Sequence, residues 1–307
     1  RELSGAGLDI DDLAYVIYEA DNIAAGADRR EAEGDLNDRG AKFDSDLCLE
    51  NIFNVFSGDA EPSYFSLREL DAMKKENFPH GNKSIATQGQ YASIMRYMEK
   101  NFRMKSPISM EENELLRILE DTLIYVPSST NTEEHADISL YDHMKMTGAT
   151  AAVLMKYMKT LGITDYKGFC FTHNKENRNK DVFLMISGDF SGIQKFIYHI
   201  RSEGAMRMLR GRSFYLDIAL ENIVDELLNA LHLSRANLIY CSGGHFYILA
   251  DNTKETQDAV KDVAKKINQG LVKLFSGTLY LAIGCEPLCA NDLMAESDTV
   301  HLSLIHI

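Results

Sequence analysis

The fold of the second part of the chain is decided by the stretch Ala236-Asn237-Leu238-Ile239-Tyr240-Cys241-Ser242-Gly243-Gly244-His245-Phe246-Tyr247-Ile248-Leu249-Ala250. Residues 236–241 and 246–250 are short apolar runs of the kind that form β-strands. Between them, Gly243 and Gly244 supply the positive φ angles that a tight two-strand turn needs. The stretch therefore predicts a β-hairpin.

The segments on both sides of this hairpin predict the remaining elements of an α+β domain. Before it we expect a strand at 181–187 and helices at 191–202 and 212–231, and after it a helix at 253–275 and a strand at 278–284. The helical segments carry apolar residues on one face, and the strand segments are short apolar runs. The resulting order is β-α-β-β-α-β, which is the split βαβ or ferredoxin-like plan.

The first part of the chain is predicted to be rich in α-helix. Apolar residues recur at helical spacing in four segments, 9–26, 91–100, 110–123 and 139–159. Gly26 is the expected end of the first of these helices. Short strand-like pieces are expected at 49–56 and 64–67, and residues 163–180 are expected to link the two parts.

Composition excludes several classes of protein. The 307 residues include 46 Asp and Glu against 32 Lys and Arg, which gives a net charge of −14, and 45% of them are hydrophobic. These fractions are ordinary for a globular protein, and no apolar run approaches the length of a membrane span. Five cysteines, an odd number without framework spacing, favour a reducing compartment. We therefore expect a cytoplasmic protein with no membrane partner.

A local basic stretch contrasts with this overall acidity. Between residues 195 and 212 the single acid Glu203 is outnumbered by five basic residues, Lys195, Arg201, Arg207, Arg210 and Arg212. Such a patch suits a triphosphate or an RNA backbone. A solvated helix face, or salt bridges between subunits, would account for it equally well.

Two motifs are candidates for binding a nucleotide. The turn Gly243-Gly244 would let the backbone approach phosphate groups, although His245 follows it where metal-dependent palms place an acidic residue. Asp189 and Ser191 lie where a strand ends and a helix begins, a natural place for a metal ion or phosphates. Taken singly, the first motif is explained as a hairpin turn and the second as a helix cap. In the ferredoxin-like plan the first strand adjoins the hairpin, so Asp189 and the two glycines are expected to face one site.

Acidic and histidine side chains in the α-rich part are candidates for a metal site. Asp142 and His143 lie near the start of one predicted helix, and Asp21 lies on another. Metal phosphohydrolases collect such ligands from separate helices. A helix cap and a surface histidine would explain the same residues. Cys285 and Cys289 form the only close cysteine pair, without a second pair to complete a zinc site.

Together these motifs resemble the large subunit of type III-A CRISPR effector complexes. The matching segments follow the family's order along the chain and are highly specific as a set: Ala20-Asp21-Asn22-Ile23-Ala24, Asp28-Arg29-Arg30, Pro127-Ser128-Ser129-Thr130-Asn131-Thr132-Glu133-Glu134, Ser139-Leu140-Tyr141-Asp142-His143, Asp189-Phe190-Ser191-Gly192-Ile193-Gln194-Lys195-Phe196-Ile197, Leu209-Arg210-Gly211-Arg212-Ser213-Phe214-Tyr215 and Ser242-Gly243-Gly244-His245-Phe246.

The resemblance implies a helical HD-type nuclease domain, incomplete at its N-terminus, at 1–162 and a ferredoxin-like first palm at 181–290. Residues 163–180 would form the linker, and 291–307 would begin the next region. In this family the HD domain cuts single-stranded DNA with ions such as Mn, Ni or Co. Two palms together convert ATP into cyclic oligoadenylates with Mg or Mn once target RNA is bound.

The resemblance also assigns roles to particular residues. The first palm would contribute a nucleotide pocket, whose expected residues are Asp189, Ser191, Gly243, Gly244 and His245. Asp21 is the expected survivor of the metal centre, with Asp142 and His143 as further candidates. The implied partners are the other subunits of a type III-A complex, CRISPR RNA, target RNA, single-stranded DNA and ATP.

Two alternative functions have to be considered beside the one that the resemblance implies, and the ends of the chain carry a separate prediction. The main alternative is a catalytically decayed scaffold subunit of the same kind of complex. A free-standing GGDEF-type cyclase is disfavoured because His245 occupies the acidic position. The family's His-Asp pair and its Gly-Gly-Asp-Asp turn are expected to lie outside these 307 residues. The 307-residue chain is therefore expected to be a fragment that is inactive by itself. Residues 302–307 match a translated sequencing adapter and are expected to derive from one.

Overall fold

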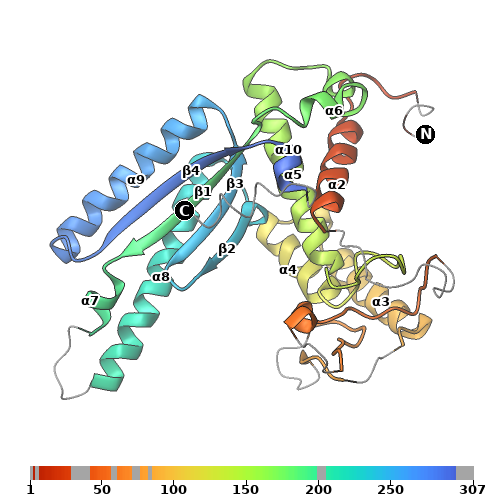
Figure 1. Ribbon diagram of the computed structural model, residues 1–307, viewed down its shortest axis with the longest axis horizontal. Helices are drawn as coiled ribbons and strands as arrows, with labels where there is room; N and C mark the ends of the chain where they lie inside the picture. Colours follow the sequence, from red (N-terminus) through yellow and green to blue (C-terminus); the bar gives the residue numbers. More distant parts are fainter. Residues whose placement is uncertain are drawn as a thin grey trace. The chain divides into compact units, whose positions relative to one another are not determined.

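The computed structural model describes residues 3, 7–28, 42–56, 61–70, 77–81, 85–198 and 205–294 (Figure 1). By its internal contacts the chain divides into two compact units. One is Ala24–Thr147, and the other combines Arg1–Ile23 with Gly148–Ile307. This division falls within two helices and differs from the boundary expected near residue 162. The segment 302–307, expected to derive from an adapter, lies outside the described residues.

The larger unit is built on a four-stranded antiparallel sheet with strand order β2-β3-β1-β4. From residue 183 onward its elements in chain order are β1 (Phe183–Ser191), α7 (Ile193–Tyr198), α8 (Ala205–Leu231), η6 (Arg235–Asn237), β2 (Leu238–Ser242), β3 (His245–Asp251), α9 (Lys254–Phe275), β4 (Tyr280–Leu288) and α10 (Ala290–Leu293). The predicted β-α-β-β-α-β order is therefore confirmed over residues 183–288. The hairpin predicted from Gly243 and Gly244 joins β2 to β3.

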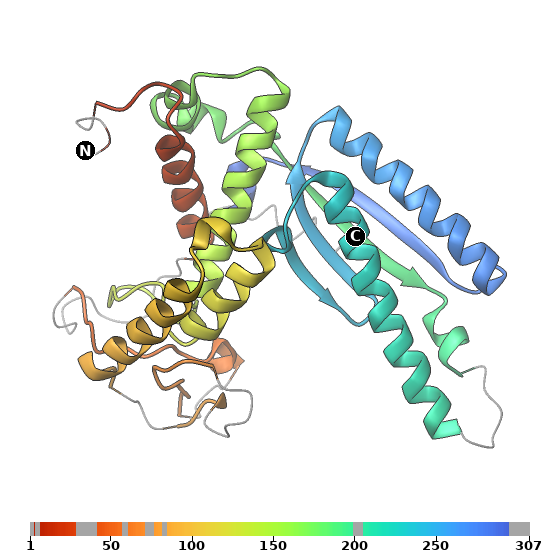
Figure 2. The same cartoon turned by 180° about the vertical axis from the view of Figure 1, so that it is seen from behind.

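The core of this unit lies between one face of the sheet and the helices α8 and α9, which stand in front of the strands in Figure 2. Side chains alternate across a strand, and in β1 Leu184, Ile186 and Phe190 point into this core. Gly188 lies in the same row because a Cβ there would meet the ring of Phe246 at 2.1 Å. The intervening residues of β1 consequently belong to the opposite face of the sheet.

The segment expected to be a linker, 163–180, is structured instead. It contains the π-helix η5 (Gly168–Thr172) and the short helix α6 (Asn174–Asn177). The Arg178 guanidinium donates to both carboxylate oxygens of the buried Glu19 on α2 (Leu13–Asp28), at 2.6 and 2.9 Å. An ion pair buried in this way ties the segment firmly to α2, and composition alone did not indicate it.

The smaller unit is mostly helical and irregular. Its helices are η2 (Ile52–Phe56), α3 (Gln88–Met104), η4 (Pro107–Ser109), α4 (Glu112–Leu123) and the start of α5 (Leu140–Thr160). The helices predicted at 91–100, 110–123 and 139–159 are confirmed, and a capping box between Thr87 and Gln90 starts α3 earlier than expected. The first predicted helix continues past Gly26 as α2, which ends at Asp28.

The strands predicted at 49–56 and 64–67 are wrong. Residues 52–56 form a 3₁₀-helix, and around them the backbone makes only isolated bridges, such as Glu50 with Tyr64. The Asn54 side chain accepts from the backbone N–H of Ser63 at 2.9 Å and donates to its carbonyl at 3.0 Å. Asparagine side chains that bond to the backbone in this way compete with a strand ladder.

Within the described residues, none of the helices has the length and apolar character that crossing a membrane requires.

Candidate functional site

The turn between β2 and β3 has the backbone conformation that its two glycines predict. The φ angles are 63° at Gly243 and 93° at Gly244, so the predicted positive φ is confirmed at both residues. A Cβ at Gly244 would lie 2.4 Å from the Cδ1 of Ile193, whereas a Cβ at Gly243 would meet nothing within 4 Å. Gly244 is therefore held by packing, and Gly243 is the glycine that leaves the turn open to a ligand.

Asp189 and His245 lie opposite each other on β1 and β3. Asp189 Oδ1 is 3.1 Å from His245 Nδ1, and the side chains are 44% and 54% exposed. Because His245 directly follows Gly244, the structure brings Asp189 to the glycine turn, as the ferredoxin-like plan predicts. Ser191, two residues further along β1, is also exposed and pairs with Tyr280 on β4.

A pocket of about 390 Å³ lies on this open face of the sheet. Asp189 and His245 line it together with Ser187, Tyr247 and Glu286. The strand register explains the hollow, because Ser187 lies between Tyr247 on β3 and Gly284 on β4, where no side chain fills the space. The Tyr247 ring is 6.1 Å from that of Tyr240 on β2, which gives one side of the face an aromatic surface.

Ser187, Tyr247 and Glu286 were not predicted as site residues. The signal that could have found Ser187 is the period of two along a strand, which places it on the same face as Asp189. Tyr247 follows from the same period counted from His245. Glu286 could not be found this way, because the register of β4 against β1 is a long-range pairing that the sequence does not reveal.

The open face and the adjoining glycine turn carry several kinds of group that bind nucleotides in proteins. Backbone N–H groups at a glycine turn can approach phosphates closely, a carboxylate can bind a phosphate through a divalent ion, and an aromatic ring can stack on a base. In the described part of the chain, no group of three or more His, Cys, Asp and Glu side chains is arranged to hold a metal ion.

Asp142 and His143 make separate contacts in the smaller unit. The Asp142 carboxylate accepts from the hydroxyl of Ser139 at 2.7 Å, and the Asp142 N–H donates to that hydroxyl oxygen at 3.0 Å. This exchange is a capping interaction at the start of α5. His143 Nδ1 lies 2.7 Å from Asp28 Oδ2, and both side chains are largely buried.

Asp21 lies on the exposed side of α2 and belongs to the other compact unit. The three-residue metal set of Asp21, Asp142 and His143 thus stays a prediction. Asp28, the carboxylate that contacts His143, was not chosen as a site residue, although Asp28-Arg29-Arg30 was among the family motifs. The motif that contains Asp28 is visible in the sequence. The contact of Asp28 with His143 is not, because the two residues are far apart along the chain.

Part of the basic stretch has a structural role. The Arg212 guanidinium lies 5.2 Å from the ring centroid of Phe196 and donates to the Phe196 carbonyl. Arg207 and Arg210 are exposed on the first turns of α8. Arg201 lies outside the described residues.

Comparison with known proteins shows that the chain is similar to CRISPR proteins. Residues 182–305 match the family model described as Csm1 subunit domain B. The chain is 39% identical over 286 residues to the single-strand-specific deoxyribonuclease Cas10/Csm1 (subtype III-A) of Mycobacterium tuberculosis, covering 92% of this chain and 34% of the relative. It is 36% identical over 305 residues to the protein of the same name from Enterococcus italicus, covering 97% of this chain and 40% of the relative.

Solved structures agree with these sequence matches. The crystal structure of Csm1 from T. onnurineus superposes with a TM-score of 0.73 at 30% identity, over 95% of this chain and 37% of that one. A Csm1–Csm4 cassette in complex with cA4 gives a TM-score of 0.72 at 30% identity, over 94% and 35% of the two chains. Similar cassettes hold AMPPNP or pppApA.

These matches extend along almost the whole chain, and the chain spans between 34% and 40% of the length of the two relatives. The match to the family model begins at the first residues of β1 and includes the glycine turn and β4. The chain is therefore a homologue of Cas10/Csm1, the large subunit of type III-A CRISPR systems, over somewhat more than a third of that subunit's length.

Proposed function

We propose that this chain is part of the large subunit of an RNA-guided type III-A interference complex. The intact protein is expected to cleave single-stranded DNA and to convert ATP into cyclic oligoadenylates when target RNA binds. The relatives named as single-strand-specific deoxyribonucleases support the first activity. Relatives crystallised with AMPPNP, pppApA and cA4 support the second.

In this proposal the sheet-containing domain at 181–290 is a first palm whose open face holds an adenine nucleotide. The observation that carries this assignment is the position of Asp189 and His245 beside the Gly243-Gly244 turn, over a pocket of about 390 Å³. Phosphates would approach the turn at Gly243, where no Cβ stands in the way. Tyr247, in contact with Tyr240, would offer its ring to the base.

The same face explains why this palm would bind rather than transform the nucleotide. Two-metal phosphoryl transfer needs paired carboxylates beside the turn. Here an imidazole, His245, stands opposite the Asp189 carboxylate beside the turn, and the other carboxylate of the pocket, Glu286, lies further along the sheet opposite Met185. A divalent ion such as Mg or Mn would neutralise phosphate charge at Asp189, and the catalytic turn would be supplied by a second palm.

We assign the helical region at 1–162 to an HD-type nuclease domain. The contact between His143 Nδ1 and the Asp28 carboxylate supports this assignment, because a carboxylate on one ring nitrogen commonly orients a metal-binding histidine. Asp21 and Asp142 are the proposed carboxylate ligands. A transition metal of the Mn, Ni or Co type would activate water for attack on DNA.

The experiment that tests the proposed function uses the intact subunit in its complex with CRISPR RNA and target RNA. With labelled ATP, Asp189→Ala is expected to reduce cyclic oligoadenylate formation at least tenfold. Glu255→Gln, on the exposed first turn of α9, is the matched control and is expected to act as wild type. If the wild-type complex made no oligoadenylate and cut no single-stranded DNA, the alternative of a catalytically decayed scaffold would be correct.

A further inference from the structure

The outer edge of β4 is a free strand edge in the described structure. In the sheet order β2-β3-β1-β4, the nine-residue strand β4 has β1 as its neighbour on one side and ends the sheet on the other. Such an edge presents unpaired N–H and C=O groups that can accept a further strand. This edge borders the open face on which Asp189 and His245 lie, because Ile283 and Cys285 of β4 also line the pocket there.

The side chain of Asn268 on α9 shows which backbone groups point outward. Its amide donates to the carbonyl of Leu281, and its carbonyl accepts from the Leu281 N–H, both at 2.9 Å. In an antiparallel pair such groups alternate with a period of two. Ile283 and Cys285 therefore also direct their N–H and C=O groups outward, away from β1.

Beyond Leu281, the edge offers a short ladder with a defined end. Among the described residues, no hydrogen bond reaches the backbone of Ile283 or Cys285 from outside β1. The next outward residue is Pro287, which has no N–H to donate. The side chain of Asn268 closes one end of the ladder, and Pro287 closes the other. The edge therefore fits a short extended segment rather than a long added strand.

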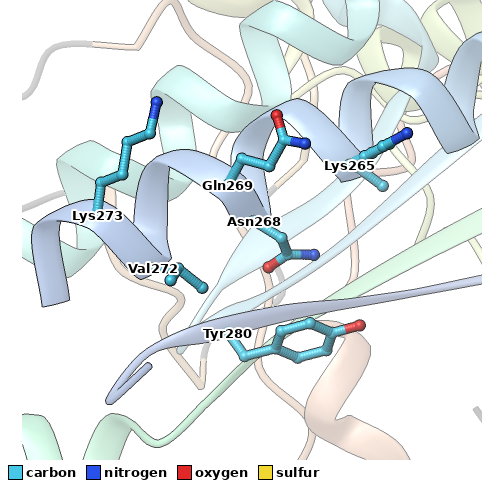
Figure 3. A pocket seen from close by; sticks show the side chains of 7 residues that line it. Lys265, Asn268, Gln269, Val272, Lys273 and Tyr280 are labelled. Carbon is cyan, nitrogen blue, oxygen red and sulfur yellow. The ribbon is translucent and has the colours of Figure 1, made fainter. Parts of the chain in front are cut away.

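A groove of about 810 Å³ runs beside this edge, between α9 and the start of β4. Figure 3 shows Val272 and Asn268 of α9 facing Tyr280 of β4, whereas the side chain of Lys273 extends away from Tyr280. Val272 and Tyr280 are each about half exposed, which leaves apolar surface for a side chain of an added strand. Among the described residues that line the groove, the charged ones are Lys265 and Lys273.

The charge beside the edge continues along α9. Burial raises the pKa of the Cys285 thiol, and the ammonium of Lys261 partly opposes this rise, so Lys261 lies within electrostatic reach of Cys285. Lys261 and Lys265 are one helical turn apart, and Lys273 is two turns further on. The Asp258 carboxylate lies 3.9 Å from the Lys261 ammonium and partly offsets its charge, so the positive charge beside the edge is mainly that of Lys265 and Lys273.

We propose that the β4 edge at Ile283 and Cys285 is a docking site for an extended, acidic peptide segment of a partner protein. The segment would add to the sheet as a fifth strand, with its carboxylates beside Lys265 and Lys273. A second copy of this chain fits poorly, because pairing two β4 edges would bring the same lysines together. The proposal does not depend on the proposed function, although Ile283 and Cys285 also line the pocket on the nucleotide face.

The test compares two substitutions at one position in the whole 307-residue chain. Cys285→Pro removes one outward N–H, and the matched control Cys285→Thr keeps it. The probe is a fluorescent octapeptide of alternating Glu and Val, measured by anisotropy. We expect the Thr variant to bind as wild type and the Pro variant to bind at least tenfold more weakly. The double variant K265E/K273E should lose binding, whereas K265R/K273R should keep it.

A second probe covers the case in which the proline variant fails to fold. The same octapeptide with alternate backbone amides N-methylated cannot form the ladder, so wild type should bind it at least tenfold more weakly than the parent peptide. Equal binding of the two peptides, or equal binding by the Pro and Thr variants when both are folded, overturns the proposal. Self-association abolished by Cys285→Pro, or an oligoadenylate RNA that binds in place of the peptide, would overturn it as well.

Discussion

Asp189 and His245 form a cross-strand pair on the face of the sheet that the helices leave uncovered, with Oδ1 and Nδ1 3.1 Å apart. Each side chain is about half exposed, so the pair adds little to folding. The pair is instead positioned to contact a ligand, because it places a carboxylate and an imidazole among the residues that line the pocket, beside the glycine turn.

The conformation of Gly243 predicts which substitutions the turn accepts. In the intact complex, Gly243→Val is expected to reduce cyclic oligoadenylate synthesis at least tenfold, because a β-branched residue strongly disfavours a φ of 63° and blocks close approach of phosphate. Gly243→Asn is the matched control, since asparagine tolerates left-handed backbone and nothing lies within 4 Å of its Cβ. Normal synthesis by the Val variant, measured with labelled ATP, would rule out the turn as a phosphate contact.

Gly188 and Gly270 differ in the space available for a Cβ atom, so replacing each by alanine should change stability in opposite directions. Gly188→Ala is expected to lower the free energy of unfolding by about 1–3 kcal/mol, because its Cβ would overlap the ring of the fully buried Phe246. Gly270→Ala, in α9 with open space around its Cβ, is expected to raise it by about 0.5–1 kcal/mol. Urea unfolding of both variants measures the difference, and a Gly188→Ala protein as stable as wild type would contradict the packing described for the sheet.

The hairpin and the order of the elements around it could be predicted from the sequence, and the packing between distant segments could not. Gly243 and Gly244 predict their turn from local sequence, because glycine alone adopts a positive φ at two adjacent residues without a steric penalty. The contact of Glu19 with Arg178 gave no such signal, since it joins residues that are remote in the chain. For that reason, residues 163–180 were expected to be a linker.

The residues of the candidate site also differ in whether the sequence could predict them. Asp189, His245 and the two glycines could be brought together from the sequence because the ferredoxin-like plan fixes which strands are neighbours. The further lining residue Glu286 depends on the register of β4, which no local pattern determines. The failed strands at 49–56 and 64–67 have another cause, because polar side chains there took up backbone groups that a sheet would have used.

A buried ion pair fastens α5 to the end of β3. The Lys156 ammonium lies 2.8 Å from Oδ1 of the fully buried Asp251 and donates to the Leu231 carbonyl at 2.8 Å. Lys156→Met is expected to lower the free energy of unfolding by about 3–5 kcal/mol, because it leaves a buried carboxylate without its cation. Lys254→Met removes an exposed pair with Asp258 and serves as the control, with no change in the urea midpoint expected. Equal midpoints for the two variants would show that the Lys156 contact is not buried in solution.

The thiol of Cys170 predicts a dependence of stability on pH. Burial, with the charge of Glu19 as a smaller cause, raises its pKa from 9.0 to about 12. Above about pH 9 the unfolded chain releases this proton and the folded chain keeps it, so stability is complete below pH 9 and falls as the pH rises toward 12. Urea unfolding at pH 7 and pH 10 should show a smaller loss in Cys170→Ala than in wild type. An identical loss in the two proteins would mean that the thiol ionises equally in both states.

The face around Asp189 and His245 is proposed to bind an adenine nucleotide, and the affinity of the intact subunit for AMPPNP tests this claim. Isothermal titration should give binding at least about tenfold weaker for the double variant D189N/H245Q than for wild type, because charge-assisted contacts to the bound phosphates are lost. Since the pair is half exposed, the variant should unfold at nearly the same urea concentration as wild type. Equal AMPPNP affinity in two equally folded proteins would contradict the claim.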